Sequence, residues 1–451
     1  MPVSGVKNRE SEESMAELYA EGKEDRRRGP PRVLIVGAST RAAAHAAIRA
    51  GYMPICADSF ADADLRACAE TVPVYDYPEG LVEAASIRVK SGKAISLDKL
   101  ADTARIPRKF ESPWMYTGAV ENHPDIVAAI QQDESAGRRA LWGNPPEVLR
   151  RVRDPAYLAS ILDSASIPAL AVRPSTAPPL EGAWLIKPLA SGGGRGIEIW
   201  NGSDSPTRSE PHYFQQYRPG LPLTGLFLAC KDGTHCLGVS RQLVGLPMVN
   251  ASQFGYCGSI APWSLPPELA QKVVKIGELI GSVFMLRGLF GVDFVQDEAG
   301  LWVTEVNPRY PASAEVVELW LRYPLMQWHR LACEGFLNGK PFVPRLPTND
   351  PAHVPTTDCI GKIVLFAAQE SLCFDATRWI HVPNDFRMPE VADIPLPGMR
   401  IARGQPVCTL FAQGASPPEC TQALLEKAAW FQRDYLRILE PALLESLAGK
   451  R

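Results

Sequence analysis

The segment GLFGVDFVQDEAGLWVTEVNPRY, from Gly288 to Tyr310, constrains the fold more than any other stretch of the chain. Apolar and polar residues alternate over residues 291–296 and again over 301–306, which is the pattern of two half-buried strands. Residues 297–300 supply the Asp, Glu and Gly that favour a tight turn. The segment therefore predicts a β-hairpin, and the polar side chains on its strands need an explanation.

Those polar side chains have the composition of a metal site. Glu305 and Asn307 lie two residues apart and share one face, and Asp293 can lie across from them on the antiparallel strand. Mg²⁺ prefers hard oxygen ligands, usually one or two carboxylates with phosphate and water. We therefore predict that these three residues form a magnesium platform. Arg309, just beyond, is a fork-shaped donor suited to a phosphate or carboxylate oxygen. A solvated polar hairpin is the alternative, which the apolar surroundings disfavour.

A lysine stands in another apolar strand, directly before a glycine-rich loop. The sequence WLIKPLASGGGRGIEIW predicts a strand containing Lys187, a loop, and a second strand. A buried lysine is costly unless it meets an anion, and a loop of glycines presents backbone N–H groups to phosphates and moves as a lid. An edge-strand lysine beside a flexible hairpin is the alternative. Together the two features predict a phosphate site.

Composition excludes several classes of function. The chain has 451 residues, 46% of them hydrophobic and 22% charged, which predicts a globular protein of two to four domains. The net charge of -3 gives no electrostatic signature for nucleic acid or a membrane surface. No apolar run reaches the roughly 18 residues that span a bilayer, and we see no signal-peptide core. The ten cysteines form no CxxC pair, so we expect reduced thiols in a cytoplasmic protein.

The N-terminal third of the chain predicts an α/β layer. Residues 1–30 are charged and poor in large apolar side chains, so we expect a mobile tail. A buried strand over residues 33–36, an alanine-rich helix ending at Gly51 and a strand over residues 53–58 then begin a doubly wound fold. We expect a third strand at TVPVYDY and helices around residues 81–104 and 121–137.

The turn after the first strand invites comparison with a dinucleotide site. Asp58 follows Gly37 by about 20 residues, where a ribose-binding acid would lie. The turn reads GASTRA, however, and lacks the second and third glycines that let a pyrophosphate approach. We therefore expect no NAD site, although Ser39 and Arg41 are placed to bind an anion at the helix N-terminus.

The remaining chain alternates strands and helices. We expect strands at PHYFQQYRPG, LFLAC and HCLGVSRQLV, a helix over residues 266–286 and another over residues 313–334. The last hundred residues are rich in proline and predict short strands at CIGKIVLFAA, TRWIHVP and QPVCTLFAQG. A closing helix is expected over residues 418–438.

The order of these elements resembles the ATP-grasp superfamily. The lysine strand with its glycine loop, then QQYRPG, then GVDF…TEVNPR match the family over roughly residues 145–340, and E-x-N-P-R is the most specific part. More narrowly, GASTRAAAHAAIRAGYMPICADSF, ENHPDIV, GNPPEVLRRVRDP and DIPLPGMRIARGQPVCTLFAQG resemble a subfamily of predicted ATP-dependent carboligases. That subfamily is described as related to biotin carboxylase and often linked to one-carbon cofactor genes.

The resemblance implies a domain order. A Rossmann-like N-terminal α/β domain over residues 31–144 would precede an ATP-grasp fold of two subdomains over residues 145–345, with a hinge near residues 214–220. A small β-rich C-terminal region with the closing helix would occupy residues 346–451. The implied fold class is thus α/β combined with α+β.

The resemblance also implies roles for individual residues. Nucleotide phosphates would lie against the lysine and the loop, the adenine edge against the hinge, and Mg²⁺, with Mn²⁺ as an alternative, on the hairpin. Arg309 would stabilise an acyl-phosphate, and Arg241 would lie on the substrate side. The implied ATP-binding residues are Lys187, Ser191, Gly192, Gly193, Gly194, Gly196, Gln216, Tyr217 and Arg218.

Two positions depart from the family pattern. Many members have a second nucleotide-binding cation in the helix before the lysine strand, and here only Arg151 or Arg153 can substitute. Many also have a ribose-binding acid shortly after the hinge, where this chain offers only Thr224. Nucleotide affinity and selectivity are the properties that these departures affect.

The function that the resemblance implies is an ADP-forming carboxylate–amine ligase, with small-molecule acid and amine substrates. A carboxylase that activates bicarbonate is the second class, although the chain contains no biotinylated Met-Lys segment. A non-catalytic nucleotide-binding protein is the third, and an NAD-dependent enzyme is a distant fourth. We expect no nucleic-acid or membrane partner, and a homodimer is a family-level expectation.

Overall fold

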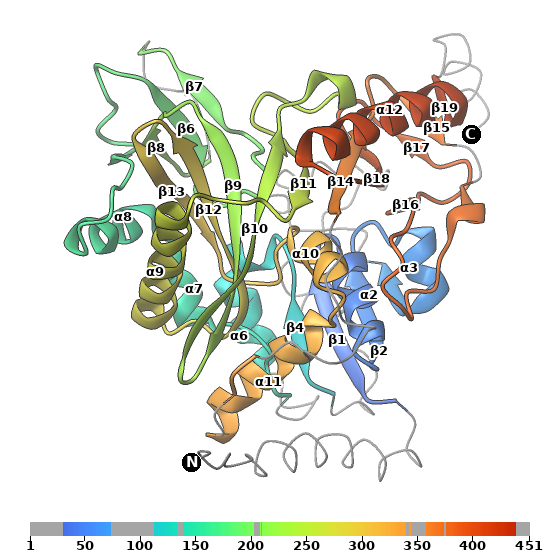
Figure 1. Ribbon diagram of the computed structural model, residues 1–451, viewed down its shortest axis with the longest axis horizontal. Coiled ribbons are helices and arrows are strands. Elements are labelled where there is room, and N and C mark those ends of the chain that lie inside the picture. The colour runs from blue at the N-terminus through green and yellow to red at the C-terminus, as the bar shows by residue number, and fades with distance from the viewer. Residues whose placement is uncertain are drawn as a thin grey trace, which may run out of the picture.

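Figure 1 shows the computed structural model of the chain. It describes residues 30–73, 112–132, 139–202, 208, 210–339, 342–344, 358–373 and 376–438. Nearly all of the tail expected over residues 1–30 and the helix expected around residues 81–104 lie outside the described residues. Among the described residues, no helix is long and apolar enough to cross a membrane.

Four parallel strands form the N-terminal sheet, in the order β3-β2-β1-β4. The continuous apolar run of β1 is buried on both faces, as a central parallel strand requires. Alanines of α2 let that helix pack closely on the sheet, and Gly51 ends it with a φ of +84°. The elements are β1 (Arg32–Gly37), α2 (Arg41–Arg49), β2 (Met53–Asp58), α3 (Ala63–Cys68), β3 (Glu70–Pro73), β4 (Trp114–Tyr116), η2 (Val120–Asn122) and α6 (Pro124–Gln132).

A small antiparallel sheet follows, in the order β5-β8-β6-β7. Its core consists of Trp184, Ile186 and Phe214. Helices α7 and α8 precede it, and Asp154 caps α8 by accepting hydrogen bonds from two backbone N–H groups. The elements are α7 (Pro146–Val152), α8 (Pro155–Ser164), β5 (Val172–Pro174), β6 (Trp184–Pro188), β7 (Glu198–Trp200) and β8 (His212–Gln216).

An eight-stranded antiparallel sheet, which we call the large sheet, connects the middle of the chain to its C-terminal part. Its order is β13-β12-β9-β10-β11-β14-β18-β16, so the expected hairpin forms one edge and C-terminal strands extend the other. Strands that precede and follow residue 345 in the chain therefore belong to one sheet. The strands are β9 (Leu221–Cys230), β10 (Gly233–Val244), β11 (Tyr256–Ala261), β12 (Gly288–Asp297), β13 (Gly300–Asn307), β14 (Cys359–Phe366), β16 (Val391–Ala392) and β18 (Pro406–Gly414).

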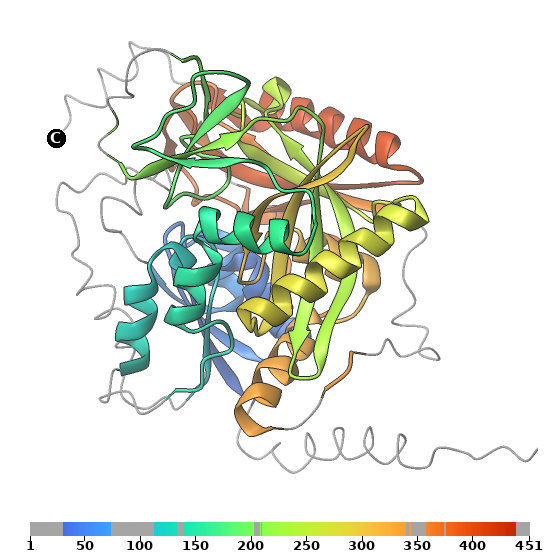
Figure 2. The same ribbon diagram turned by 90° about the vertical axis from the view of Figure 1, so that its left-hand side faces the viewer.

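Helices cover the faces of the large sheet. Helix α9 packs its apolar stripe on one face, around Phe227 and Phe290, and α12 packs on β14 and β18 near the C-terminus. Figures 1 and 2 both show α12 (red) above the N-terminal strands (blue). The remaining elements are η4 (Pro247–Val249), α9 (Pro267–Phe284), α10 (Ala314–Leu321), α11 (Leu325–Asn338), β15 (Ser371–Cys373), η6 (Thr377–Trp379), β17 (Arg400–Ile401), α12 (Pro417–Tyr435) and β19 (Leu436–Ile438).

Two predictions of secondary structure were wrong. The helix expected over residues 313–334 is broken into α10 and α11, because Arg322 adopts a φ of +51° and Pro324 cannot continue a helix. The strand expected at TRWIHVP is instead a 3₁₀ turn, in which Trp379 packs against Trp430 and Tyr435 of α12. Aromatic packing against a distant helix decides that segment, and its own sequence does not.

Candidate active site

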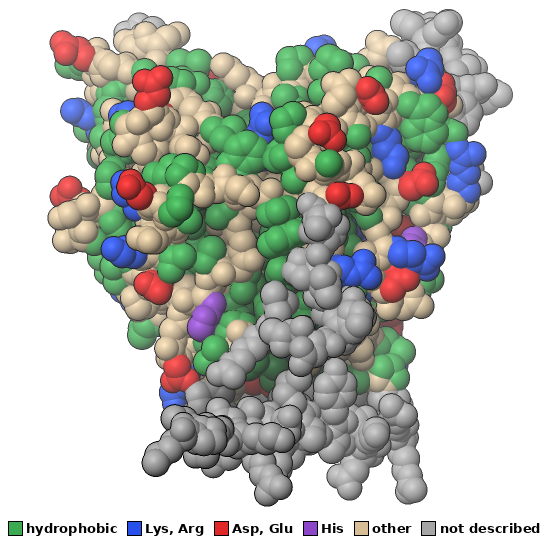
Figure 3. All heavy atoms as spheres, in the orientation of Figure 1, with side chains coloured by type: hydrophobic (Ala, Val, Ile, Leu, Met, Phe, Trp, Pro, Cys, Tyr) green, Lys and Arg blue, Asp and Glu red, His purple; other side chains and the backbone are tan. Residues whose placement is uncertain are grey.

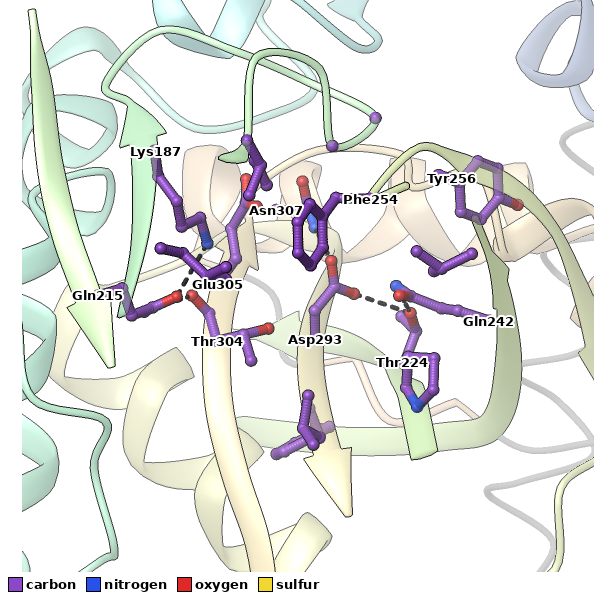
Figure 4. A pocket seen from close by; sticks show the side chains of 18 of the residues that line it. Lys187, Gln215, Thr224, Gln242, Phe254, Tyr256, Asp293, Thr304, Glu305 and Asn307 are labelled. Carbon is purple, nitrogen blue, oxygen red and sulfur yellow. Dashed lines mark hydrogen bonds between the residues drawn. The ribbon is translucent and has the colours of Figure 1, made fainter. Parts of the chain in front are cut away.

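A cavity of about 400 Å³ lies between the small sheet and the large sheet. Its lining combines the glycine loop, the segment after β8 and the polar face of the hairpin. Figure 4 shows the side chains of Lys187, Asp293 and Glu305 at this cavity. The cavity size is typical of a small-molecule site. The sequence-predicted residues that line it are Lys187, Ser191, Gly192, Gly193, Gly194, Gln216, Tyr217, Arg218, Asp293, Glu305, Asn307 and Arg309.

The hairpin brings its polar residues together as the sequence predicted. Asp293 pairs directly with Glu305, and Asn307 pairs with Gly291. Asn307 Nδ2 donates to Asp293 Oδ2 at 2.9 Å, and Thr224 Oγ1 donates to the other carboxylate oxygen at 2.7 Å. The two carboxylates thus lie side by side at the floor of the cavity (Figure 4).

The two carboxylates have opposite shifts of pKa. Burial and the neighbouring Glu305 raise the pKa of Asp293 to about 6. Burial also acts to raise the pKa of Glu305, but the positive charges of Arg153 and Lys187 outweigh it and lower that pKa. Two adjacent, partly buried carboxylates repel each other, so the pair favours a further cation.

These residues fit a divalent cation only with help from a ligand. No group of three or more His, Cys, Asp or Glu side chains with metal-binding geometry occurs among the described residues. Asp293 and Glu305 supply two carboxylates, and Asn307 Oδ1 is a third hard oxygen that now accepts from Arg309 at 3.2 Å. Two carboxylates completed by phosphate oxygens and water are the usual coordination of Mg²⁺. The donor set therefore suits a metal bound together with a polyphosphate.

Lys187 is held at the wall of the cavity by a chain of hydrogen bonds. It is only 7% exposed, and its Nζ donates to Gln215 Oε1 at 3.0 Å. Gln215 in turn donates to the carbonyl oxygen of Thr304 at 3.1 Å. Burial alone would lower the pKa of Lys187, but Tyr213 and Glu305 raise it above the usual value, so the ammonium stays charged. A charged ammonium beside the cavity is a ready partner for an anion.

The glycine loop closes over the cavity and is fixed at two points. Tyr256 N–H donates to the carbonyl oxygen of Gly193 at 2.9 Å, and Asn122 Nδ2 donates to that of Ser191 at 3.2 Å. Gly194 has a φ of +77°, and a Cβ there would overlap the carbonyl oxygen of Phe254. Glycine is required at this position both for the backbone angle and for the close approach.

The segment after β8 is tied to both sheets. Gln216 N–H donates to Ala171 O, and Tyr217 N–H donates to Ala183 O, each at 2.8 Å. The Arg218 guanidinium lies 3.9 Å from the Trp302 ring centroid, and its Nε donates to Asp297 at 2.8 Å. This connection between the sheets is therefore anchored to the turn of the hairpin.

Comparison with known proteins assigns this architecture. The model of the ATP-grasp domain family matches residues 157–313. The biotin carboxylase domain of Hydrogenobacter thermophilus 2-oxoglutarate carboxylase, crystallised with MgADP, ADP and bicarbonate, has a TM-score of 0.62 at 14% identity over 90% of each chain. The chain has the ATP-grasp fold.

Other relatives agree on the ATP-grasp fold and differ in chemistry. The L-amino acid ligase of Bacillus licheniformis has a TM-score of 0.60 at 16% identity, covering 91% of this chain and 99% of that one. The N5-carboxyaminoimidazole ribonucleotide synthetase of Thermotoga maritima has a TM-score of 0.55 at 13% identity, covering 91% and 99%. Among curated proteins, the uncharacterized protein MJ0776 of Methanocaldococcus jannaschii is 25% identical over 234 residues, which is 51% of this chain and 50% of that protein. The match thus spans about half of that relative.

Two residues next to the ATP-grasp cavity were not predicted from the sequence. Glu121, only 1% exposed, accepts from Arg309 Nε at 2.7 Å, and Asn122 accepts from Arg153 at 2.9 Å. Arg153 also pairs with Glu305. Glu121 and Asn122 follow the C-terminal end of β4, the edge of a parallel sheet where ligand sites form, and that position is the signal that could have identified them.

Arg241 and Gly196 do not line the cavity. Arg241 neighbours the cavity-lining Gln242 on β10, and its guanidinium lies 5.8 Å from the Trp263 ring centroid. Adjacent residues of a strand point to opposite faces, so Arg241 is directed away from the cavity. Of the two arginines considered as a second cation, Arg153 reaches the hairpin, whereas Arg151 packs over Tyr157.

The anion site expected at Ser39 and Arg41 was wrong. Arg41 is 2% exposed and bonds to Glu315 and Asp393, so its guanidinium is already occupied. Asp58 accepts from the backbone and hydroxyl of Thr40 and fills the N-terminus of α2. A carboxylate of the chain itself therefore takes the place of an external anion.

The glycine loop gives a direct test of closure over the ATP-grasp cavity. We expect Gly194→Ala to weaken binding of a non-hydrolysable ATP analogue by about tenfold or more, since left-handed strain alone costs roughly 1–2 kcal/mol. Gly192→Ala is the matched control, because no atom lies within 4 Å of a Cβ at that position. Isothermal titration calorimetry measures both, and equal affinities for the two variants would contradict the assignment.

The pKa of Asp293 predicts how metal binding depends on pH. Because that pKa is raised to about 6, Asp293 takes up a proton as the pH falls through 6, and the proton competes with a cation. We expect Mg²⁺ to add to the thermal stabilisation given by an ATP analogue above about pH 7 and to add little near pH 5. Asp293→Asn should lose the Mg²⁺ increment at both values, and exposed Asp163→Asn should retain it. A Mg²⁺ increment independent of pH would count against Asp293 as a ligand.

Proposed function

We propose that the protein is an ATP-dependent ligase that activates a substrate carboxylate as an acyl-phosphate for attack by an amine. One observation carries the proposal: a single cavity is lined by a buried charged lysine, a glycine loop and the paired carboxylates of the hairpin. Phosphoryl transfer needs positioned charges and no protein nucleophile, and these residues supply such charges. The ATP-grasp fold and the L-amino acid ligase among its neighbours support the same class.

In this proposal the chain's own residues hold the nucleotide. Lys187 would contact its phosphates, the loop from Ser191 to Gly194 would cover them, and backbone groups of Gln216 to Arg218 would meet the adenine edge. Arg153 would take the place of the second nucleotide-binding cation that many family members have in the helix before the lysine strand. Thr224 donates its hydroxyl hydrogen to Asp293 and would therefore hold a metal ligand in place. The ribose would have no acidic partner after the hinge.

Asp293, Glu305 and Asn307 would hold Mg²⁺, or Mn²⁺ as an alternative. A bound divalent cation neutralises charge that develops on transferring phosphate oxygens. Arg309 would hold the carboxylate of the acid, and Glu121 fixes the direction of that guanidinium through its hydrogen bond to Nε. The buried Glu121 thus acts on the reaction through Arg309.

The proposed reaction balances in two steps. A carboxylate oxygen attacks the γ-phosphorus of ATP, and the bond from that phosphorus to the β–γ bridging oxygen breaks to release ADP. The amine nitrogen then attacks the acyl carbon, and phosphate leaves with the former carboxylate oxygen. The proton lost by the amine passes to solvent or to phosphate.

A carboxylase that activates bicarbonate is the second candidate. It is favoured by neighbours such as the biotin carboxylase domain, whose complex contains bicarbonate. The same Arg309 would then hold bicarbonate in place of a larger acid. We also propose that the chain belongs to the carboligase subfamily linked to one-carbon cofactors. Its domain limits near residues 144 and 345 and its assembly as a homodimer are proposals as well.

Glu305 separates a ligase from a non-catalytic relative of the same fold. Glu305→Gln keeps the size of the side chain and removes its charge, so we expect turnover to fall about a hundredfold, equivalent to ~3 kcal/mol of transition-state stabilisation. Asn307→Asp should cost less, and Arg309→Ala should impair acid-dependent turnover more than ATP binding. The measurement is ADP release over a panel of carboxylic acids, with and without amines.

The control for that experiment is the exposed Asp163→Asn variant, which should turn over at the wild-type rate. Bicarbonate belongs in the acid panel, because ADP release with bicarbonate alone would select the carboxylase. If Glu305→Gln matched the wild type at saturating Mg²⁺, the hairpin would not be the metal platform.

A further inference from the structure

A second cavity, of about 410 Å³, lies between the N-terminal sheet and the C-terminal strands of the large sheet. Phe60 and Asp62 line it from the loop before α3, and Val364, Val407 and Thr409 line it from β14 and β18. Most of this lining is apolar, and the volume lies within the range of small-molecule sites. None of the residues assigned above to ATP or metal binding takes part in it.

One polar side chain in this cavity has no partner. Asp62 is 8% exposed, and no described residue donates a hydrogen bond to its carboxylate, although it stands at the N-cap position of α3. Its neighbours are satisfied: Asp58 accepts from Thr40, and Asp64 accepts from the backbone N–H groups of Asp393 and Ile394. A buried carboxylate without a donor is costly unless a ligand supplies one.

The charges around Asp62 are also unbalanced. Arg41 is shared by Glu315, Asp393 and Asp64, and the other buried cation there, Lys362, also pairs with Glu315. Burial and the nearby charges of Asp393 and Asp58 raise the pKa of Asp62 well above its usual value. A positive charge beside Asp62 would relieve this repulsion, so the cavity is complementary to a cation.

An organic ammonium fits this requirement better than a metal ion. The described residues contain no cluster of His, Cys, Asp or Glu with metal-binding geometry, and most of the cavity lining is apolar. Arg400, a cation in the lining, is already paired with Glu370. An apolar body with one amino group would bury hydrocarbon against Val364 and Val407 and would direct its nitrogen to Asp62. On the face of the molecule drawn in Figure 3, acidic and basic side chains are interspersed.

We propose that this second cavity binds an organic amine with an apolar body, recognised by Asp62. Its role as the nucleophile of the ligase reaction rests on the proposed function, whereas amine binding itself does not. Residues that adjoin the two cavities meet in the ion-pair cluster around Arg41. Glu315 lies two residues after Ser313, which lines the nucleotide cavity, and Asp393, the other partner of Arg41, lines the second.

Calorimetry without nucleotide tests the binding, with hexylamine as the probe and 1-hexanol as its uncharged match. We expect the wild type to bind hexylamine at least about tenfold more tightly than 1-hexanol, and Asp62→Asn to lose that preference. Asp163→Asn, at an exposed position, is the matched control and should keep it. Equal affinities for the two probes, or no detectable hexylamine binding at about 10 mM, would overturn the proposal.

A second measurement guards against misfolding and separates the two hypotheses. Asp62→Asn should unfold at or above the wild-type temperature, since burial and the neighbouring carboxylates already disfavour the charged form of Asp62, and should bind the ATP analogue as the wild type does. Ser39→Ala, at the rim of the same cavity, should leave the amine preference intact. If the protein binds hexylamine but releases no ADP with any acid and amine, the ligase is refuted and the amine site stands. If it releases ADP but does not prefer hexylamine to 1-hexanol, the amine site is refuted and the ligase stands.

Discussion

Buried charges centred on Arg41 connect the N-terminal sheet region to helix α10 and to the C-terminal strands. Arg41 belongs to α2, and its partners Glu315 and Asp393 belong to α10 and to the segment after β16, while Lys362 of β14 also bonds Glu315. Removing one partner of a buried ion pair leaves an unpaired charge and costs roughly 3–5 kcal/mol. The orientation of the N-terminal sheet relative to the large sheet therefore depends on this cluster, and both cavities depend on that orientation.

In the first cavity, between the small sheet and the large sheet, several cations are held by carboxylates of the protein. Arg153 and Lys187 face Glu305 from two different elements, and Arg309 is held by Glu121 from a third. These contacts fix the directions of the cations before any ligand enters, which lowers the reorganisation needed for phosphoryl transfer. Glu305 thus anchors Arg153 of the protein itself, and Asp293 is held by Thr224 and Asn307.

The sequence predicted the features that depend on local patterns. The hairpin, its register between Asp293 and Glu305, and the strand carrying Lys187 follow from alternation and turn residues, and the structure confirms them. Glu121 and the occupied guanidinium of Arg41 depend on partners more than a hundred residues away, which no local pattern contains. Arg241 illustrates the same limit, since a shift of one residue along β10 decides which face a side chain occupies.

The two cavities differ in electrostatic character, and that difference gives each a distinct ligand. Arg153, Lys187 and Arg309 make the first cavity attractive to a polyphosphate and a carboxylate. In the lining of the second cavity, the carboxylates of Asp62, Asp393 and Glu370 outnumber the guanidinium of Arg400, which favours an ammonium over such anions. Because buried charges are screened little by salt, this sorting persists at physiological ionic strength. The proposed ligase would have to keep its acid and its amine apart until the acid is activated, and two cavities of different charge would provide that separation.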